Sequence, residues 1–175
     1  MSHPAQQNFV ERLKQKYQSH FVGTRVLEVG SLNINGTVRV FFDNCDYLGI
    51  DVGEGPGVDL VCQGQDLKHP DNTYDVSISC ECFEHNPYWV ETFQNMIRMT
   101  KSNGLVVMSC ATTGRLEHGT RRTTPHDAPL IPWDYYKNLT EDDFKSHFSL
   151  ADIFTEFAFE VYEPHHDLYF YGIKR

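Results

Sequence analysis

Residues 27–36 read LEVGSLNING and place an acidic residue inside an apolar run. Glu28 lies between Leu27 and Val29, and the run stops at Gly30 before small polar residues follow. A glycine allows the backbone to approach a ligand closely, and polar side chains in a turn supply hydrogen-bond donors and acceptors. The decapeptide therefore predicts either a site for a small polar ligand or a tight turn without one.

Polar groups that suit a nucleoside follow the next two apolar runs. Asp51 stands 21 positions after Gly30 (51 − 30), roughly the spacing at which a carboxylate accepts bonds from ribose hydroxyls in nucleotide-binding folds. Gln63 and Gly64 follow the third run, where a side-chain amide and a backbone N–H group suit an adenine. The residues that follow the three apolar segments therefore predict contacts to three parts of a ligand: a group bound by the loop after Gly30, a ribose and a base.

The loop after Gly30 discriminates between two kinds of nucleotide cofactor. A dinucleotide needs Gly-x-Gly-x-x-Gly, so that its pyrophosphate can bind backbone N–H groups at the start of a helix. Leu32 and Asn35 occupy the second and third glycine positions, and Glu28 would repel phosphates. A carboxylate there suits the ammonium and sulfonium groups of S-adenosyl-L-methionine (SAM).

The elements that must position these groups alternate between strand and helix patterns, which predicts an α/β fold. Its sheet is Rossmann-like and mostly parallel, with helices on both faces, a C-terminal antiparallel hairpin and a shortened connection between the second and third strands. An amphipathic helix ending near Gly23 comes first, and Asn86 and Pro87 begin a second helix that ends by Gly104. The expected strands are 26–29, 47–52, 58–61, 75–79, 105–109, 157–162 and 168–173.

Composition limits the class of protein. The chain has 175 residues and a formal charge of −9, which fits one domain and disfavours nucleic acid and anionic membranes as partners. No secretory signal or membrane-spanning run is recognised, so a cytoplasmic location is expected. The five cysteines resemble reduced core thiols, and Cys80 with Cys82 lacks two further zinc ligands, so no metal site is predicted.

Four segments resemble the successive motifs of small class I SAM-dependent methyltransferases of the type 11 kind. They are LEVGSLNING, YLGIDV, VCQGQDLKHPDNTYDVSISCECFEH and TKSNGLVVMS, and the resemblance spans roughly residues 24–111. It implies the cofactor SAM, with S-adenosyl-L-homocysteine as the product. By this resemblance the cofactor-binding residues are Glu28, Gly30, Ser31, Asn33, Asp51, Val52, Gln63, Gly64 and Cys80.

Three departures from the family pattern are visible. Only the first glycine of the usual glycine-rich loop is present, at Gly30, and Gln63 stands where an Asp commonly contacts adenine. The connection GEGPG, residues 53–57, is too short for a helical crossover between parallel strands. Either the third strand is vestigial or the helix is absent, and the exposed edge makes a homodimer conceivable.

One domain is expected over residues 1–175. It divides into an N-terminal helix (1–23), a SAM-binding core (24–111), a lid insertion over the acceptor site (112–146) and a C-terminal hairpin region (147–175). Candidate catalytic residues are His85, His118 and His126, because imidazole titrates near neutral pH. Candidate substrate-binding residues are Arg121, Arg122, Tyr135 and Tyr136, although a solvated arginine pair and packed aromatics remain the alternatives.

The predicted function is methyl transfer from SAM to a hydroxyl or amine of a small or carrier-linked metabolite. A sugar or glycan-related hydroxyl is one candidate acceptor, suggested by the polar, histidine-bearing lid. Two alternatives stay open at this point: a NAD-dependent oxidoreductase on a related fold, and a SAM-binding module without catalysis.

Overall fold

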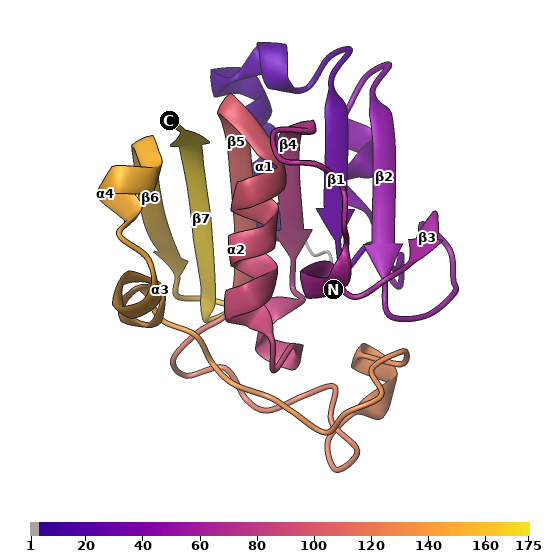
Figure 1. Ribbon diagram of the computed structural model, residues 1–175. Coiled ribbons are helices and arrows are strands. Elements are labelled where there is room, and N and C mark those ends of the chain that lie inside the picture. Colours follow the sequence, from indigo (N-terminus) through magenta and orange to yellow (C-terminus); the bar gives the residue numbers. More distant parts are fainter. Residues whose placement is uncertain (1–3) are drawn as a thin grey trace.

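A seven-stranded sheet forms the centre of the protein, whose computed structural model describes residues 4–175 (Figure 1). The strand order is β3-β2-β1-β4-β5-β7-β6. The first five strands pair in parallel, whereas β7 is antiparallel to both β5 and β6. The strands are β1 Arg25–Val29, β2 Asp46–Asp51, β3 Leu60–Val61, β4 Tyr74–Cys80, β5 Thr100–Ala111, β6 Phe154–Tyr162 and β7 Asp167–Lys174. The predicted Rossmann-like sheet with its antiparallel hairpin is confirmed.

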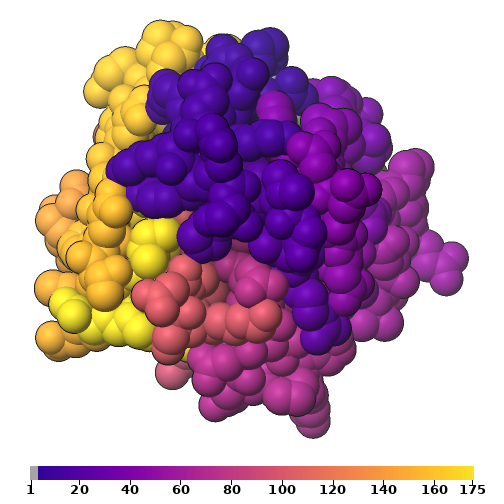
Figure 2. Space-filling view, turned by 90° about the horizontal axis from the view of Figure 1, so that it is seen from above, coloured from indigo at the N-terminus to yellow at the C-terminus, as the bar shows by residue number. Residues whose placement is uncertain are grey.

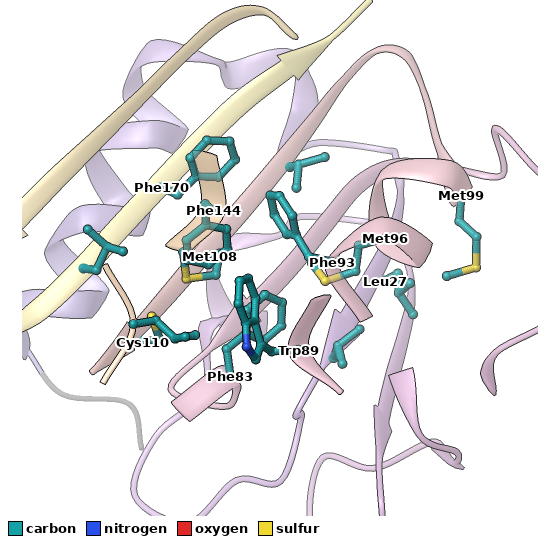
Figure 3. Close-up of a cluster of buried hydrophobic side chains, with 14 of the residues drawn as sticks. Leu27, Phe83, Trp89, Phe93, Met96, Met99, Met108, Cys110, Phe144 and Phe170 are labelled. Carbon is teal, nitrogen blue, oxygen red and sulfur yellow. The ribbon is translucent and has the colours of Figure 1, made fainter. Parts of the chain in front are cut away.

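Helices cover both faces of the sheet, as predicted. Helix α1 (Pro4–Lys16) packs on one face together with alternate side chains of β1, β4 and β5. Helix α2 (Trp89–Met99) lies in front of the sheet in Figure 1, on the face to which α3 (Glu141–His147) and α4 (Leu150–Ile153) contribute. Figure 3 shows the apolar core between α2, α3 and the sheet. Two separate cores therefore fix the parallel strands from both sides.

The N-terminal helix is shorter than predicted. Helix α1 ends at Lys16 rather than near Gly23, and a 3-10 turn, Gln18–His20, follows it. In the view of Figure 2 the indigo N-terminal residues lie beside the yellow C-terminal strands. The Lys16 Nζ atom donates to Glu156 Oε1 at 2.6 Å and to the Tyr171 hydroxyl at 3.0 Å, which ties α1 to β6 and β7.

The predicted start of α2 is wrong by a few residues. The helix begins at Trp89 and its cap position is Tyr88, so Asn86 is not its cap. Asn86 has an extended backbone, as residues before proline tend to have. The Asn86 side chain instead accepts from the Tyr88 N–H at 2.8 Å. Pro87 therefore lies in the turn before α2.

The connections after β1 and β2 contain no α-helix within residues 4–175. The chain after Gly30 runs irregularly to a 3-10 turn, Val38–Phe41, before β2. The connection from β2 to β3 is also irregular, and β3 has two residues. Both predictions for the shortened region hold, since the helix is absent and the third strand is vestigial.

None of the helices in the described part of the chain combines the length and apolar character needed to cross a membrane.

Candidate functional site

Two adjoining cavities lie at the carboxyl ends of β1, β2 and β4, where the strand order reverses. The larger encloses about 640 Å³ and the smaller about 380 Å³, counted with their open mouths. Ligands of open α/β sheets bind at such a reversal of strand order. The residues that line both cavities are Gly30, Asp51, Cys82, His85 and Ile131. We therefore treat the cavities as two arms of one cleft.

The larger arm carries negative charge. Among the described residues that line it, Glu28, Asp51, Glu81 and Asp127 are acidic, and none is a lysine or an arginine. Such a lining attracts cationic groups and repels phosphates. Apolar side chains of Leu130 and Ile131 complete the wall.

The smaller arm is mostly apolar and carries amides. Ile50, Ile131 and Trp133 contribute apolar surface, while Gln63 and Gln65 contribute amide groups. The Gln65 Nε2 atom donates to Gln63 Oε1 at 2.8 Å, which fixes the Gln63 side chain and leaves its oxygen a second lone pair. A flat heterocycle with polar edges fits this arm.

The turn after β1 depends on Gly30. Its φ is +81°, in the left-handed region, and a Cβ atom there would lie 2.7 Å from the Cβ of Cys82. The next loop packs against this turn, since the Asn33 N–H donates to Pro56 O at 2.8 Å. The segment GEGPG thus supports the turn directly, where a crossover helix would otherwise stand.

Gly30→Ala is expected to lower the free energy of unfolding by about 2–4 kcal/mol, because backbone strain and the collision with Cys82 add. Gly23→Ala is the matched control, since Gly23 also has a positive φ, +66°, but nothing lies within 4 Å of its added Cβ. The control should lose only about 1 kcal/mol in denaturant unfolding. Equal losses in the two variants would refute the steric part of this account.

Asp51 ends β2 and orders the turn from the other side of the cleft. Its Oδ2 accepts from the Leu32 N–H at 3.0 Å, and its Oδ1 accepts from the Val52 N–H at 2.7 Å. Burial raises the pKa of Asp51, and these two backbone bonds oppose that rise. Each oxygen keeps a lone pair for a ligand hydroxyl.

Glu28 points into the larger arm from the middle of β1. It is buried, and its Oε2 accepts from the Tyr47 hydroxyl at 2.8 Å. Burial raises the pKa of Glu28 to about 7, against the hydrogen bond from Tyr47. Near it, the Ser31 hydroxyl is buried without a hydrogen-bond partner among the described residues. A carboxylate and an unengaged hydroxyl together suit an ammonium group.

His85 lies on a 3-10 turn, Phe83–His85, that follows β4, and it lines both arms. Burial lowers its pKa to about 3, with His118 adding to the effect. An imidazole with this pKa is a weak base at neutral pH. His85 therefore lies beside the cleft, as predicted. Its lowered pKa does not favour a role as the base that removes a proton from the acceptor.

The long segment between β5 and α3 covers the cleft. The Trp133 Nε1 atom donates to His85 O at 2.6 Å, and the Lys137 N–H donates to Glu84 O at 2.9 Å. The segment closes on itself, because the Leu139 N–H donates to Ala111 O at 2.9 Å. Figure 1 shows it crossing below the carboxyl ends of the parallel strands.

The structure brings most of the predicted cofactor residues together. Lining one arm or both are Glu28, Gly30, Ser31, Asp51, Val52, Gln63, Gly64, Cys80 and His85. Asn33 is exposed and lines neither arm, since its Oδ1 accepts from the Gly36 N–H. His118 and Tyr136 are not in the lining either, but both rings lie beside His85.

Four lid residues predicted to act on the substrate or its proton lie away from the cleft. Arg122 pairs with Glu117 at 3.3 Å, and Arg121 donates to Pro132 O at 3.3 Å, both at exposed positions. The His126 side chain is 79% exposed and faces Asp127. Tyr135 lines neither arm. The solvated alternative for the arginine pair is the one that the structure shows.

Several cleft residues were missed by the sequence predictions. Glu81 and Cys82 directly follow β4 and line the larger arm, and Glu81 has a φ of +52°. Leu130, Ile131 and Trp133 come from the lid. The sequence CEC, residues 80–82, follows an apolar run and could have indicated Glu81 and Cys82. No local sequence pattern indicates which lid residues contact the cleft.

Comparisons with known proteins agree with this geometry. Residues 41–108, less than half of the chain, match the family model of a methyltransferase domain. No curated protein matches the sequence. The resemblance to class I SAM-dependent methyltransferases thus has independent support from a family model.

Several solved structures with this fold are methyltransferases with different names and substrates, and one is the [4+2]-cyclase SpnF. The CurJ carbon methyltransferase is 16% identical over 96% of this chain and 54% of its own, with a TM-score of 0.66. Phosphoethanolamine N-methyltransferase 2 of Haemonchus contortus, solved with SAM, is 13% identical over 95% of this chain and 52% of its own, with a TM-score of 0.67. The chain thus spans about half the length of these two proteins.

A third solved structure is similar in length. The 1,6-didemethyltoxoflavin-N1-methyltransferase of Burkholderia thailandensis, solved with its substrate and S-adenosylhomocysteine, is 12% identical, with a TM-score of 0.61. The match covers 99% of this chain and 91% of that one. At these identities the comparisons establish the class I methyltransferase fold.

Proposed function

We propose that the chain binds SAM in this cleft and transfers its methyl group to a small acceptor. The observation that carries the proposal is the acid-lined larger arm at the reversal of strand order. A sulfonium and an ammonium group are stabilised there, whereas the pyrophosphate of a dinucleotide is repelled. This electrostatic difference favours SAM over NAD.

Each part of SAM has a matching set of residues. Asp51 accepts from the ribose hydroxyls, and Gln63 and Gly64 face the adenine in the apolar arm. Glu28 and Ser31 bind the ammonium end, and Gly30 lets the backbone approach it. When bound, SAM supplies a methyl group already activated by its sulfonium, so the chain's own task is to align an acceptor and exclude water.

The acceptor that fits best is a small neutral hydroxyl compound or an amine. Among the described residues that line the larger arm, no lysine or arginine is present to bind a phosphate or carboxylate, and Arg121 and Arg122 contact Pro132 O and Glu117 instead. The lid residues Leu130 and Ile131 offer apolar contact beside His85. Sugars and carrier-linked acceptors also fit this proposal, provided that the part of the molecule that receives the methyl group is uncharged or cationic.

The test is calorimetric titration of the full chain with SAM, S-adenosylhomocysteine and NAD under one set of conditions. The first two should bind and NAD should not. Binding of NAD alone would overturn the proposal in favour of a dinucleotide enzyme. SAM binding without methyl transfer to any of a panel of alcohols and amines would support the non-catalytic alternative.

The affinity for SAM is expected to fall as the pH drops below about 7, because Glu28 must lose its proton to hold a cation. The loss should approach tenfold per pH unit. The measurement is the ratio of the dissociation constants of Glu28→Gln and the parent chain at about pH 8 and about pH 6, in which the ligand's own titration cancels. A ratio that does not change with pH would contradict the role given to Glu28.

A further inference from the structure

A group of polar side chains behind the cleft lacks the hydrogen bonds that buried polar groups normally make. Glu84 is fully buried, and neither of its carboxylate oxygens makes a hydrogen bond to a described residue. His85 is 4% exposed, and its Nδ1 atom likewise has no hydrogen-bond partner within residues 4–175. Buried polar groups of this kind call for a physical explanation, such as an ion or an ordered water.

A third side chain from the lid completes the group. The rings of His118 and His85 lie 4.9 Å apart, centre to centre, and are nearly perpendicular at 89°. One ligand atom each from Glu84, His85 and His118 lies within 4.8 Å of the other two. The backbone bond from Lys137 to Glu84, described above, holds the lid against this turn.

The chemistry of the three donors matches a metal site. His118 Nδ1 lies 3.1 Å from Leu116 O, and a histidine that donates to a carbonyl through one nitrogen keeps a lone pair on the other. Two imidazoles and one carboxylate form a donor set that suits zinc, and three protein ligands leave a fourth position open. The ring of Tyr136 lies beside both imidazole rings, and its buried hydroxyl has no hydrogen-bond partner in the part of the chain that the structure describes.

We propose that Glu84, His85 and His118 bind one divalent transition-metal ion of the zinc class at the back of the cleft. Tetrahedral ligands at zinc stand about 3.3 Å apart, so the three donors must close by roughly 1.5 Å, which side-chain rotation can supply. The ion compensates the charge of the buried Glu84 carboxylate and binds the His85 Nδ1 atom, which has no hydrogen-bond partner among the described residues. It also joins the lid to the turn after β4.

The sequence prediction of no metal site considered only the cysteines. Glu84 and His85 are adjacent in the sequence, whereas His118 follows 33 positions later (118 − 85). That spacing resembles no compact zinc motif, because the lid brings His118 back to the turn only in the folded chain. The structure therefore points to a site that a motif search cannot find.

The test is a zinc titration of the untagged full chain after treatment with a chelator, against a chromogenic zinc indicator. One equivalent of zinc should bind per chain, and Glu84→Gln and His118→Gln should each weaken binding at least tenfold. His126→Gln is the matched control, because it removes an exposed lid histidine outside the group, and zinc affinity should not change. Because SAM is left out, the result does not depend on the proposed methyl transfer.

A cobalt titration gives a second readout that misfolding alone does not imitate. Co²⁺ bound by four ligands should give intense visible absorption in the parent chain and lose it in His118→Gln, while circular dichroism stays unchanged. Mg²⁺, which prefers oxygen ligands, should not displace zinc. Absence of zinc binding in the parent, or equal affinity in the parent and both site variants, would overturn the proposal and leave an ordered water as the occupant.

Discussion

Asp51→Ala is expected to weaken SAM binding by about 2–3 kcal/mol, which raises the dissociation constant about 30- to 150-fold. Two ribose hydroxyls lose a charged acceptor in this variant. The same carboxylate also accepts from the N–H groups of Leu32 and Val52, so its removal loosens the turn that holds the rest of the cofactor. Isothermal titration of the full chain measures the effect directly.

Two further variants separate charge from position. Asp51→Asn keeps the shape of the side chain and one acceptor oxygen but removes the charge, so it should lose less affinity for SAM than Asp51→Ala. Asp46→Ala changes an acid at the opposite end of the same strand, where the side chain is 70% exposed and pairs with Arg25. That control should bind SAM within about twofold of the parent, since exposed ion pairs contribute little. If Asp51→Ala bound SAM as tightly as the parent chain, the proposal that SAM binds in this cleft would be wrong.

Phe144→Ala is expected to lower the free energy of unfolding by about 3–5 kcal/mol, the range for an aromatic truncated in a core. The Phe144 side chain is fully buried on helix α3. Its ring centre lies 4.9 Å from that of Trp89 and 5.2 Å from that of Phe93, as Figure 3 illustrates. The truncation removes these contacts and leaves a cavity between α2 and α3.

Denaturant unfolding followed by circular dichroism measures this loss. Phe144→Leu should cost less than Phe144→Ala, because it fills part of the same space. Leu116→Ala is the control, since Leu116 is 83% exposed in the lid and its truncation should change stability by less than about 0.5 kcal/mol. If Phe144→Ala lost under about 1 kcal/mol, α3 would contribute little to the core.

The parts of the fold that follow from local chemistry could be predicted from the sequence. The apolar runs at β1, β4 and β5 are strands because both faces of the sheet are covered. The capping box at Thr140 and Asp143 is present, with the Thr140 N–H donating to Asp143 Oδ2 at 2.8 Å. These signals are fixed by a few neighbouring residues.

The parts that depend on distant contacts could not be predicted. Gly30 marks the turn, but the packing of GEGPG against it is invisible in either segment alone. The same reason explains why Arg121 and Arg122 were candidate substrate-binding residues, although they contact Pro132 and Glu117 within the lid. Within the site, strand ends were predictable and lid contacts were not.

The hydrogen bond between Leu139 and Ala111 has a consequence for engineering. It brings the two ends of the lid together at the rim of the sheet, so residues 112–138 leave and rejoin the sheet region side by side. The entropy of closing a loop changes by only about 0.6 kcal/mol for each doubling of its length. Lids of other lengths and compositions can therefore be grafted between Ala111 and Leu139 to change acceptor choice, while the strands that carry Glu28 and Asp51 stay as they are.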